Sequence, residues 1–195
     1  MKIKMTLLSD VVFGNGMSIP GQEDISVLVD GKGFPFYKGG TFKGVFREEL
    51  ERYLTWVVEE QDPDLKEKKI REELGRLLGQ SGSHAAERDD RLVFSEFHLS
   101  GSVCRSILEE IPNNKDAVTE CLTNMRTFTS VSRQGTAEKG SLRYARCVDK
   151  GLVFYSTIKC AKEDEALVKD VIRSIRWVGT MRNRGFGKVM IEPEE

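Results

Sequence analysis

The sequence has few cysteines, and their spacing argues against a zinc site or a disulfide framework. Cys104, Cys121, Cys147 and Cys160 are widely separated and form no Cys-x-x-Cys pair. Such pairs are the usual signature of structural zinc sites. We therefore expect free, buried thiols, which are typical of a reducing compartment and predict a cytoplasmic protein.

Long hydrophobic runs are also absent. No apolar stretch approaches the ~20 residues needed to cross a bilayer, so no membrane partner is expected. The first ten residues lack the apolar core and the cleavage site of a signal peptide. Instead, Ile3, Met5 and Leu7 alternate as on one face of a strand. With 195 residues, of which 39% are hydrophobic and 31% charged, the chain has the composition of a soluble globular protein.

The chain has little net charge, -1, but its charges are segregated. Residues 126–147 carry a net charge of +4 and residues 169–188 a net charge of +5, whereas acidic residues concentrate between 48 and 90 and at the C-terminus. This pattern permits one basic face for a polyanion on a nearly neutral protein. Solvated charges scattered over unrelated surfaces are the alternative, and sequence alone does not choose between the two.

The stretch 33–50 combines an aromatic, turn-like first half with a helix. Gly39-Gly40 breaks the backbone, Thr41 is placed to cap the helix, and apolar residues then repeat at helical spacing. The first turns carry Lys43 and Arg47 instead of the acids that a helix N-terminus favours. Free N–H groups beside two cations predict an anion site. A tight turn into an ordinary amphipathic helix with solvated cations is the alternative.

Hydrophobic periodicity and turn residues predict the elements of a mixed fold. We expect strands at the N-terminus and at 25–29, 92–99 and 151–158, and a final strand after a glycine-rich loop. Helices are expected at 41–60 and 65–78, after residue 114, and from 163 to a cap at Gly179. Two extended arms are expected on either side of a loop at 134–141. A β–helix–β start and finish predict an α+β, ferredoxin-like (RRM-like) antiparallel sheet with helices on one face. The prediction is a single domain, 1–195, with insertions at about 61–125 (helical and loop) and 130–145 (a projecting hairpin).

Four stretches, in order along the chain, match a known family. Residues 24–30 (DISVLVD) correspond to an acidic-loop segment, and residues 34–47 (FPFYKGGTFKGVFR) resemble a "PYIPGSSLKGxLR" block. Residues 91–97 (RLVFSEF) resemble "RLxFSD", and residues 133–137 (RQGTA) with 185–189 (GFGKV) resemble an "RxTGTA" hairpin and a C-terminal glycine-rich loop. The chain thus resembles the RAMP superfamily of CRISPR-associated proteins, particularly the repeated backbone subunit of type III effector complexes. It departs from the family at Lys38, where proline is usual, and it is short for a backbone subunit.

The resemblance implies a subunit that polymerises with copies of itself and with other effector subunits along a CRISPR RNA, which it holds for pairing with a complementary target RNA. The residues then expected to contact RNA are Gly39, Gly40, Thr41, Lys43, Arg47, Arg126, Arg133, Lys139, Arg182, Arg184, Gly185, Phe186, Gly187 and Lys188. Cations and N–H groups would hold phosphates, and base pairing would supply sequence specificity.

The resemblance also implies an arrangement of these residues. The helix start and the C-terminal loop are expected to form one groove, and the loop from Arg133 to Ser141 corresponds to the family's thumb. Phe128 and Val131 are interpreted as core residues of the strand rather than as base-stacking groups.

A catalytic role is implied for one acid. In this family an aspartate in the loop after the first strand cuts target RNA with a divalent metal, and Asp24 holds the matching position. Its carboxylate would coordinate Mg²⁺ or help to deprotonate the attacking 2′-OH. Glu23 is a competitor one residue away, and two merely solvated loop acids are the alternative.

Three other functions stay open. A cap subunit at one end of the same complex would bind RNA and cut nothing. A repeat-processing endoribonuclease shares the fold but often uses histidine, and it is disfavoured because neither His84 nor His98 lies near the first helix. A purely structural interaction module would leave the clustered cations without a purpose.

Overall fold

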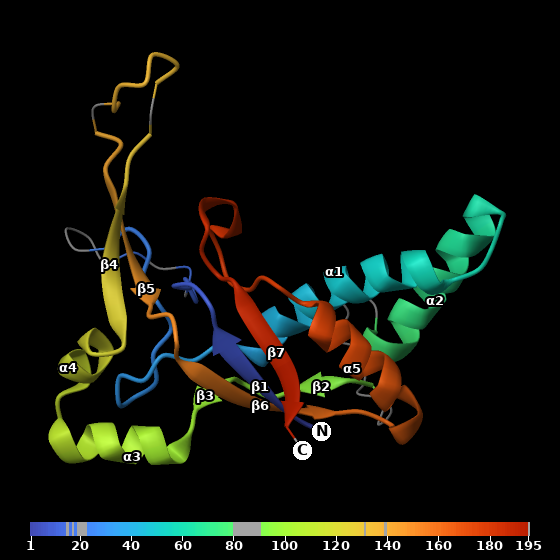
Figure 1. Ribbon diagram of the computed structural model, residues 1–195, viewed down its shortest axis with the longest axis horizontal. Helices are drawn as coiled ribbons and strands as arrows, with labels where there is room; N and C mark the ends of the chain where they lie inside the picture. Colours follow the sequence, from blue (N-terminus) through green and yellow to red (C-terminus); the bar gives the residue numbers. More distant parts are fainter. Residues whose placement is uncertain are drawn as a thin grey trace.

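An antiparallel sheet forms the centre of the computed structural model, which describes residues 1–14, 16, 18, 23–79, 91–130, 132–138 and 140–194. Its main path is β2 (Val93–Phe94), β6 (Val153–Lys159), β1 (Lys2–Leu7) and β7 (Val189–Glu194), in that order (Figure 1). A fifth short strand, β3 (His98–Leu99), also pairs with β6. Met5 of β1 lies opposite Phe154 on one side and Ile191 on the other, which sets the register of the three central strands.

Two helices, α1 (Gly39–Val57) and α5 (Glu165–Ser174), cover one face of this sheet. Side chains alternate along β1, so that Met5 is fully buried in the same apolar cluster as Phe46 of α1 and Val171 of α5. Lys4 points to the other face and pairs there with Glu192. The order β1, α1, β2, β6, α5, β7 is the βαββαβ arrangement of the ferredoxin-like fold. The predicted α+β class, with helices on one face, is confirmed.

Further elements are added to this core at two places. Helix α2 (Pro63–Leu78) follows α1 and packs against it, and the pair projects from one end of the molecule (Figure 1). Between β3 and β6 lie α3 (Gly101–Glu110), α4 (Lys115–Glu120), β4 (Thr123–Phe128) and β5 (Arg143–Val148). The expected insertion at 61–125 is therefore not continuous, because β2 and β3 within it belong to the main sheet.

Strands β4 and β5 form a projecting arm, as the sequence predicts for the thumb. They pair in register from Thr123–Val148 to Phe128–Arg143, and the arm stands at the opposite end of the molecule from α1 and α2 (Figure 1). Its base is joined to the core by two backbone hydrogen bonds between Val11 and Val148, of 3.0 and 2.7 Å. The arm is therefore anchored at its base and projects beyond it.

Two predicted helix ends are wrong. Helix α1 already begins at Gly39, with Lys38 as an N-cap residue that makes no side-chain cap, so Thr41 lies within the first turn. Helix α5 ends at Ser174, and Gly179 lies beyond it. Gly179 instead packs against the loop after β1, where a methyl group would lie 2.6 Å from the carbonyl oxygen of Val12.

Two predicted strands also differ from the structure, and one helix was not predicted. The strand at 92–99 is divided because Phe97 leaves β6 and pairs with Tyr37 instead. Residues 25–29 form only isolated bridges. Helix α3 is capped by the side chain of Ser100, and its apolar pattern is too short to be convincing in the sequence. No helix in the described ranges has the length and apolarity of a membrane span.

Candidate nucleic-acid interface

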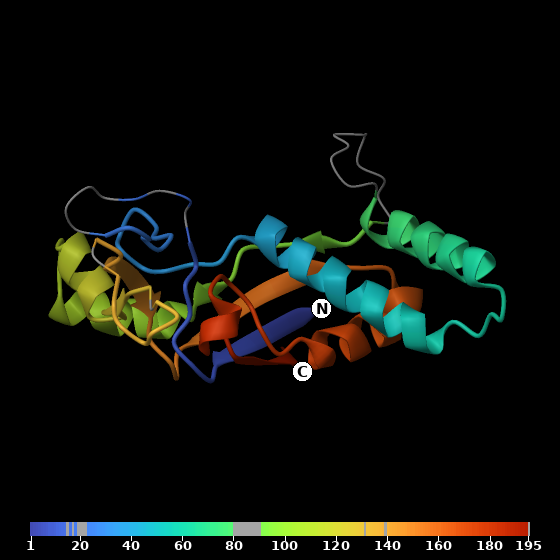
Figure 2. The same cartoon turned by 90° about the horizontal axis from the view of Figure 1, so that it is seen from above.

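The C-terminal glycine loop lies between the arm and α1 (Figure 2). It begins with the short 3-10 helix Arg182–Arg184 and turns at Gly185, whose φ of 84° is the left-handed conformation that glycine favours. Gly187 is also required, because a methyl group there would lie 2.0 Å from the carbonyl oxygen of Val178. The backbone is thus tightly held, while the side chains of Arg182, Arg184 and Lys188 are exposed.

The loop contacts the arm through aromatic rings. Phe186 meets Phe128 edge-to-face, with 5.5 Å between the ring centroids. The guanidinium of Arg184 lies over the same Phe128 ring, 5.5 Å from its centroid. Phe128 is only half-buried and does not belong to the buried apolar cluster, so the interpretation as a core residue is wrong. Val131 lies outside the described residues.

The loop also reaches α1, through Arg182 and Glu48, whose charged groups lie 3.5 Å apart. Near this contact Gly40, Thr41 and Gly44 are exposed, and a methyl group at either glycine would meet open space. N–H groups of the first helical turn are therefore accessible to an anion.

Gly39 has a different place from the other helix-start residues. It is buried, and a methyl group there would lie 2.1 Å from the carbonyl oxygen of Phe94. Packing against β2 therefore explains why this position is glycine.

Lys43 and Arg47 lie on another side of α1. Arg47 Nη2 donates a hydrogen bond of 2.7 Å to the carbonyl oxygen of Gly79, at the end of α2. Burial lowers the pKa of Lys43, and the charges of Arg47 and Arg91 lower it further. No hydrogen bond or ion pair within the described ranges joins Lys43 or Arg47 to the C-terminal loop. Cations do not bond to one another, so this absence does not test the single groove expected from the sequence, and that groove stays a prediction.

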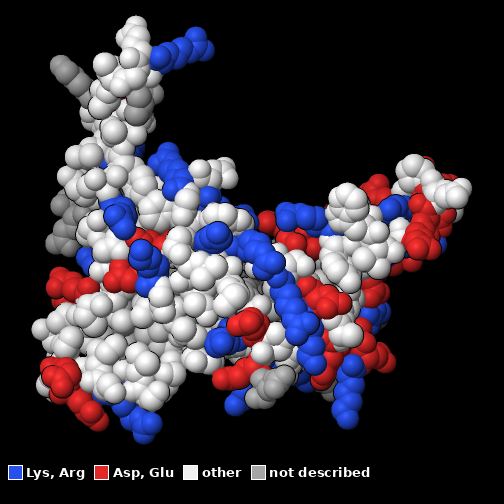
Figure 3. Space-filling model, in the orientation of Figure 1, with Lys and Arg blue, Asp and Glu red and all other residues white. Residues whose placement is uncertain are grey.

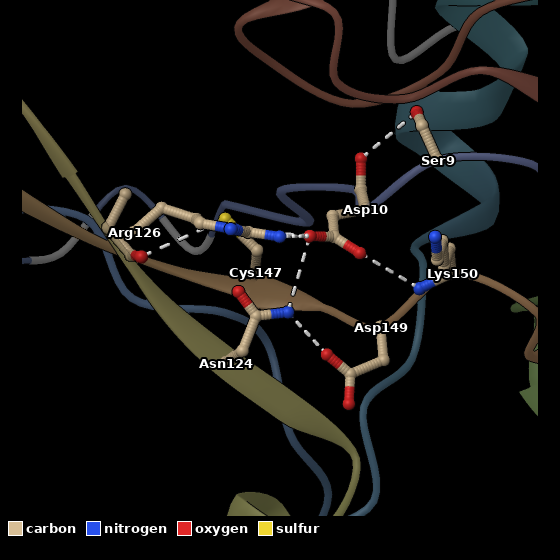
Figure 4. A network of polar contacts seen from close by, with 8 residues as sticks. Ser9, Asp10, Asn124, Arg126, Cys147, Asp149 and Lys150 are labelled. Atoms are coloured by element: carbon tan, nitrogen blue, oxygen red, sulfur yellow. Dashed lines mark hydrogen bonds and ion pairs between the residues drawn. The ribbon is translucent and has the colours of Figure 1, made fainter.

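Arg126 is held at the base of the arm by Asp10 (Figure 4). Its Nη2 and Nε atoms lie 2.6 and 3.2 Å from Asp10 Oδ2, and Asp10 also accepts from the Lys150 N–H at 3.1 Å and from Asn124 at 3.3 Å. The Asp10 carbonyl oxygen accepts from the N–H of Gly187 at 2.8 Å. Asp10 thus joins the arm to the C-terminal loop, and Arg126 is partly neutralised.

The outer part of the arm carries Arg133. This residue is exposed in the turn that Gly135 closes by donating to Ser132 C=O at 3.0 Å, and within the described ranges it has no ion pair. Lys139 lies outside the described residues.

Asp24 lies beside the first residues of β5, at the end of the strand pairing away from Val148. Its Oδ2 accepts from the backbone N–H of Tyr144 at 2.8 Å, and its Oδ1 is 3.3 Å from Nη1 of Arg143. The Tyr144 hydrogen bond and, less strongly, Arg143 hold the pKa of Asp24 below its usual value. The carboxylate is therefore ionised at neutral pH and is a weak base.

Glu23 and Asp24 are clearly distinguished by burial. The side chain of Glu23 is 5% exposed and lies 2.5 Å from Nε of Arg146, whereas that of Asp24 is 36% exposed. Of the two candidates, only Asp24 can reach a bound strand.

The acids do not form a metal site by themselves. In the described part of the chain, no three His, Cys, Asp or Glu side chains lie close enough together to hold a metal ion. Both oxygens of Asp24 already have protein partners. A Mg²⁺ ion at Asp24 would therefore need water or RNA oxygens as its other ligands.

Basic side chains gather on the face shown in Figure 3. They run from the base of the arm across the centre toward β7 and α5, and the surface is hollowed between the arm and the α1–α2 pair. This arrangement suits a long anionic ligand better than a compact one.

Comparison with known proteins agrees with this geometry. The family model described as RAMP superfamily matches residues 4–190. The chain belongs to the RAMP superfamily. A chain in the cryo-EM structure of the Type III-B Cmr-beta bound to cognate target RNA shares the RAMP fold with a TM-score of 0.67 at 13% identity, over 98% of this chain and 95% of that one. A chain of the Type III-B Cmr-beta apo state gives 0.65 at 14% identity, with the same coverage. Comparison with curated protein sequences gives no match.

Two residues of this RAMP surface were not predicted as part of it. Asp10 lies in the loop after β1, and nothing local in the sequence indicates that it binds Arg126, 116 positions away. Phe128 has the pattern of an ordinary strand residue, and only its contact with Phe186 reveals its place in the surface.

Proposed function

We propose that this chain is a subunit of a type III CRISPR effector complex and binds CRISPR RNA along its backbone, so that a complementary target RNA can pair with it. Membership of the RAMP superfamily supports this, as does the fold shared with chains of Type III-B Cmr-beta, one of them in a structure with cognate target RNA. Other effector subunits and copies of this chain are the proposed protein partners.

One observation carries the proposal: the contact of Arg184 and Phe186 with Phe128, at the outer end of β4 in the arm. It places exposed cations beside aromatic rings in the hollow between the arm and α1. Single-stranded RNA is commonly bound in this way, with cations on phosphates and aromatic rings against bases or riboses. The exposed glycines of the α1 start add accessible N–H groups on the same side.

The test is the affinity of the purified full chain for a fluorescently labelled single-stranded RNA. Arg184→Gln should weaken binding about tenfold at low salt and reduce the dependence of log Kd on log salt by about 0.7, the value for one lost phosphate contact. The matched control is Arg105→Gln, which removes an exposed arginine of α3 and should change neither quantity. Equal affinity of the Arg184→Gln variant and the wild type contradicts the proposal.

Cleavage of target RNA at Asp24 is the finer part of the proposal, and a cap subunit that binds without cutting is the second candidate. Exposure of Asp24 near the arm supports cleavage. Its lowered pKa and its lack of acidic partners within the described residues support the cap. Mg²⁺ dependence stays a prediction. The two candidates are separated by giving a labelled target to complexes assembled with the wild type or with Asp24→Asn, because fragments that depend on Asp24 are expected only if this chain cuts.

A further inference from the structure

The closed end of the α1–α2 pair exposes three large apolar side chains. Trp56 and Val57 are the last two residues of α1, and Leu65 is the third residue of α2, so the three lie on either side of the short connection 58–62. Their exposed fractions are 85%, 54% and 48%. This end of the pair, here called the helical tip (residues 56–65), projects from the molecule on the side opposite the arm (Figure 1).

Packing within the chain does not explain the exposed tryptophan. The buried stripe of α1 consists of Phe42, Phe46, Leu50 and Leu54. Trp56 lies off this stripe, because two residues along a helix rotate the side chain by about 200° from Leu54. Within the described ranges, no aromatic ring and no cation is paired with Trp56. Exposed apolar patches that polar residues surround are typical of protein–protein contact sites.

The surface around the helical tip is acidic. Residues 51–67 contain six acids and two basic residues, a net charge of -4, and Figure 3 shows acidic side chains gathered at the projecting end of the pair. Two of these acids are paired with cations of α2. The exposed carboxylates of Glu51, Glu59 and Asp64 have no ion pair within the described ranges. The tip therefore has surplus negative charge, which repels RNA and attracts a basic surface.

We propose that the helical tip docks a second, different protein of the same effector complex, which presents a basic surface with an apolar recess for Trp56. The inference rests on the proposed function. Tryptophan is enriched among the residues that dominate protein–protein binding energy, and cations around the recess would pair with the free acids of the tip. A second copy of this chain is a poorer partner, because its basic side chains gather around the hollow, where the proposed RNA neutralises them.

The experiment uses complexes assembled from the full chain, the other subunits of its effector complex and guide RNA, with subunit composition measured by native mass spectrometry. Trp56→Ala should lower the occupancy of one basic subunit about tenfold or more. Its guide RNA content should be unchanged, because the acidic tip does not hold RNA. Thermal unfolding of the free chain should also be unchanged, since no ring or cation in the described ranges is paired with Trp56.

Charge is tested separately from the apolar contact. The double substitution Glu59→Gln, Asp64→Asn should lower the occupancy of the same subunit about threefold at low salt, and the difference from the wild type should disappear at high salt. The matched controls are Val103→Ala and Glu109→Gln, which remove an exposed apolar side chain and an exposed acid from α3. Both controls should keep the wild-type composition.

Failure of this inference is distinguishable from failure of the proposed function. If Trp56→Ala complexes keep the wild-type composition while Arg184→Gln still weakens RNA binding, the docking proposal is wrong and the proposed function stands. Loss of copies of this chain instead of another subunit makes the tip a contact between copies and overturns the proposal. Loss of guide RNA from Trp56→Ala complexes makes the tip an RNA contact and also overturns it. If the wild type joins no such complex, both proposals fail.

Discussion

The guanidinium of Arg184 lies over the ring of Phe128, 5.5 Å from its centroid. A cation over an aromatic face at an exposed position contributes about 0.5–1 kcal/mol. Here the contact joins a C-terminal loop to an arm that is inserted in the middle of the chain. The arm therefore helps to fix the positions of the loop cations, and the loop in turn helps to fix the position of the arm.

Replacing the ring tests this dependence. Phe128→Leu keeps an apolar side chain but removes the partner of Arg184 and Phe186, so it should weaken RNA binding and make the arm more sensitive to limited proteolysis. Phe36→Leu is the control, because Phe36 also loses a ring partner, His98, with 5.6 Å between their centroids. RNA affinity of the control should equal that of the wild type; the same loss in both variants would contradict a specific role for Phe128.

Asp10 should be important for stability. Its side chain is 10% exposed and accepts hydrogen bonds from Arg126, Asn124 and the Lys150 N–H. Asp10→Asn loses the charge-assisted bond and should lower the free energy of unfolding by about 1.5–3 kcal/mol, measured by urea denaturation. Lys4→Gln breaks the more exposed pair with Glu192 and should cost less than about 1 kcal/mol. Equal effects would mean that the network at the arm base adds nothing.

The effect of Asp10 should depend on pH. Burial raises its pKa, but hydrogen bonds from Arg126, Lys150 and Asn124 outweigh burial and hold the pKa below its usual value of 3.8. A carboxyl group with a lowered folded-state pKa stabilises the protein fully above its unfolded pKa, and this is lost as pH falls through the folded value. The stability difference between wild type and Asp10→Asn should thus be constant from about pH 7 to about pH 5 and shrink below about pH 4. A difference that grows in acid would contradict this assignment.

Two glycines of α1 should respond oppositely to alanine. Gly44 is exposed with open space around it, so Gly44→Ala should stabilise the helix by about 0.5–1 kcal/mol. Gly39→Ala should destabilise the protein by about 1–3 kcal/mol, because the methyl group meets the Phe94 carbonyl. RNA affinity should fall for Gly44→Ala despite its added stability, since the methyl group covers the exposed helix start. Thr55→Ala, an exposed position further along α1, should leave RNA affinity unchanged.

Asp24 should be separable from Glu23 by substitution. Asp24→Asn is expected to leave folding and assembly on guide RNA intact and to abolish target cutting in the assembled complex, as EDTA should if a divalent metal takes part. Glu23→Gln should instead reduce thermal stability, because it removes the buried partner of Arg146. Normal cutting by Asp24→Asn excludes the catalytic role, and an absence of cutting by the wild-type complex favours the cap.

Much of the fold could be predicted because its signals are local. Alternation in β1 and the 3.6-residue period of α1 and α2 are properties of neighbouring residues, and Gly79 ends α2 as predicted. Boundaries failed where a distant partner competes with the local pattern, as when Phe97 turns from the sheet to Tyr37. The glycines show the same limit: the sequence treats Gly39 and Gly40 alike, as a break in the backbone, and only packing reveals that Gly39 is buried and Gly40 exposed.

For this protein, the sequence by itself determined the fold class, the arm, the glycine loop and the family, because each depends on periodicity or on short ordered motifs. The tertiary structure alone decided which charges are available. Arg126 and Arg146 resemble Arg184 in sequence, yet each is paired with an acid more than a hundred positions away, Asp10 and Glu23. Pairing and burial depend on distances in space, and such distances arise only when the chain has folded.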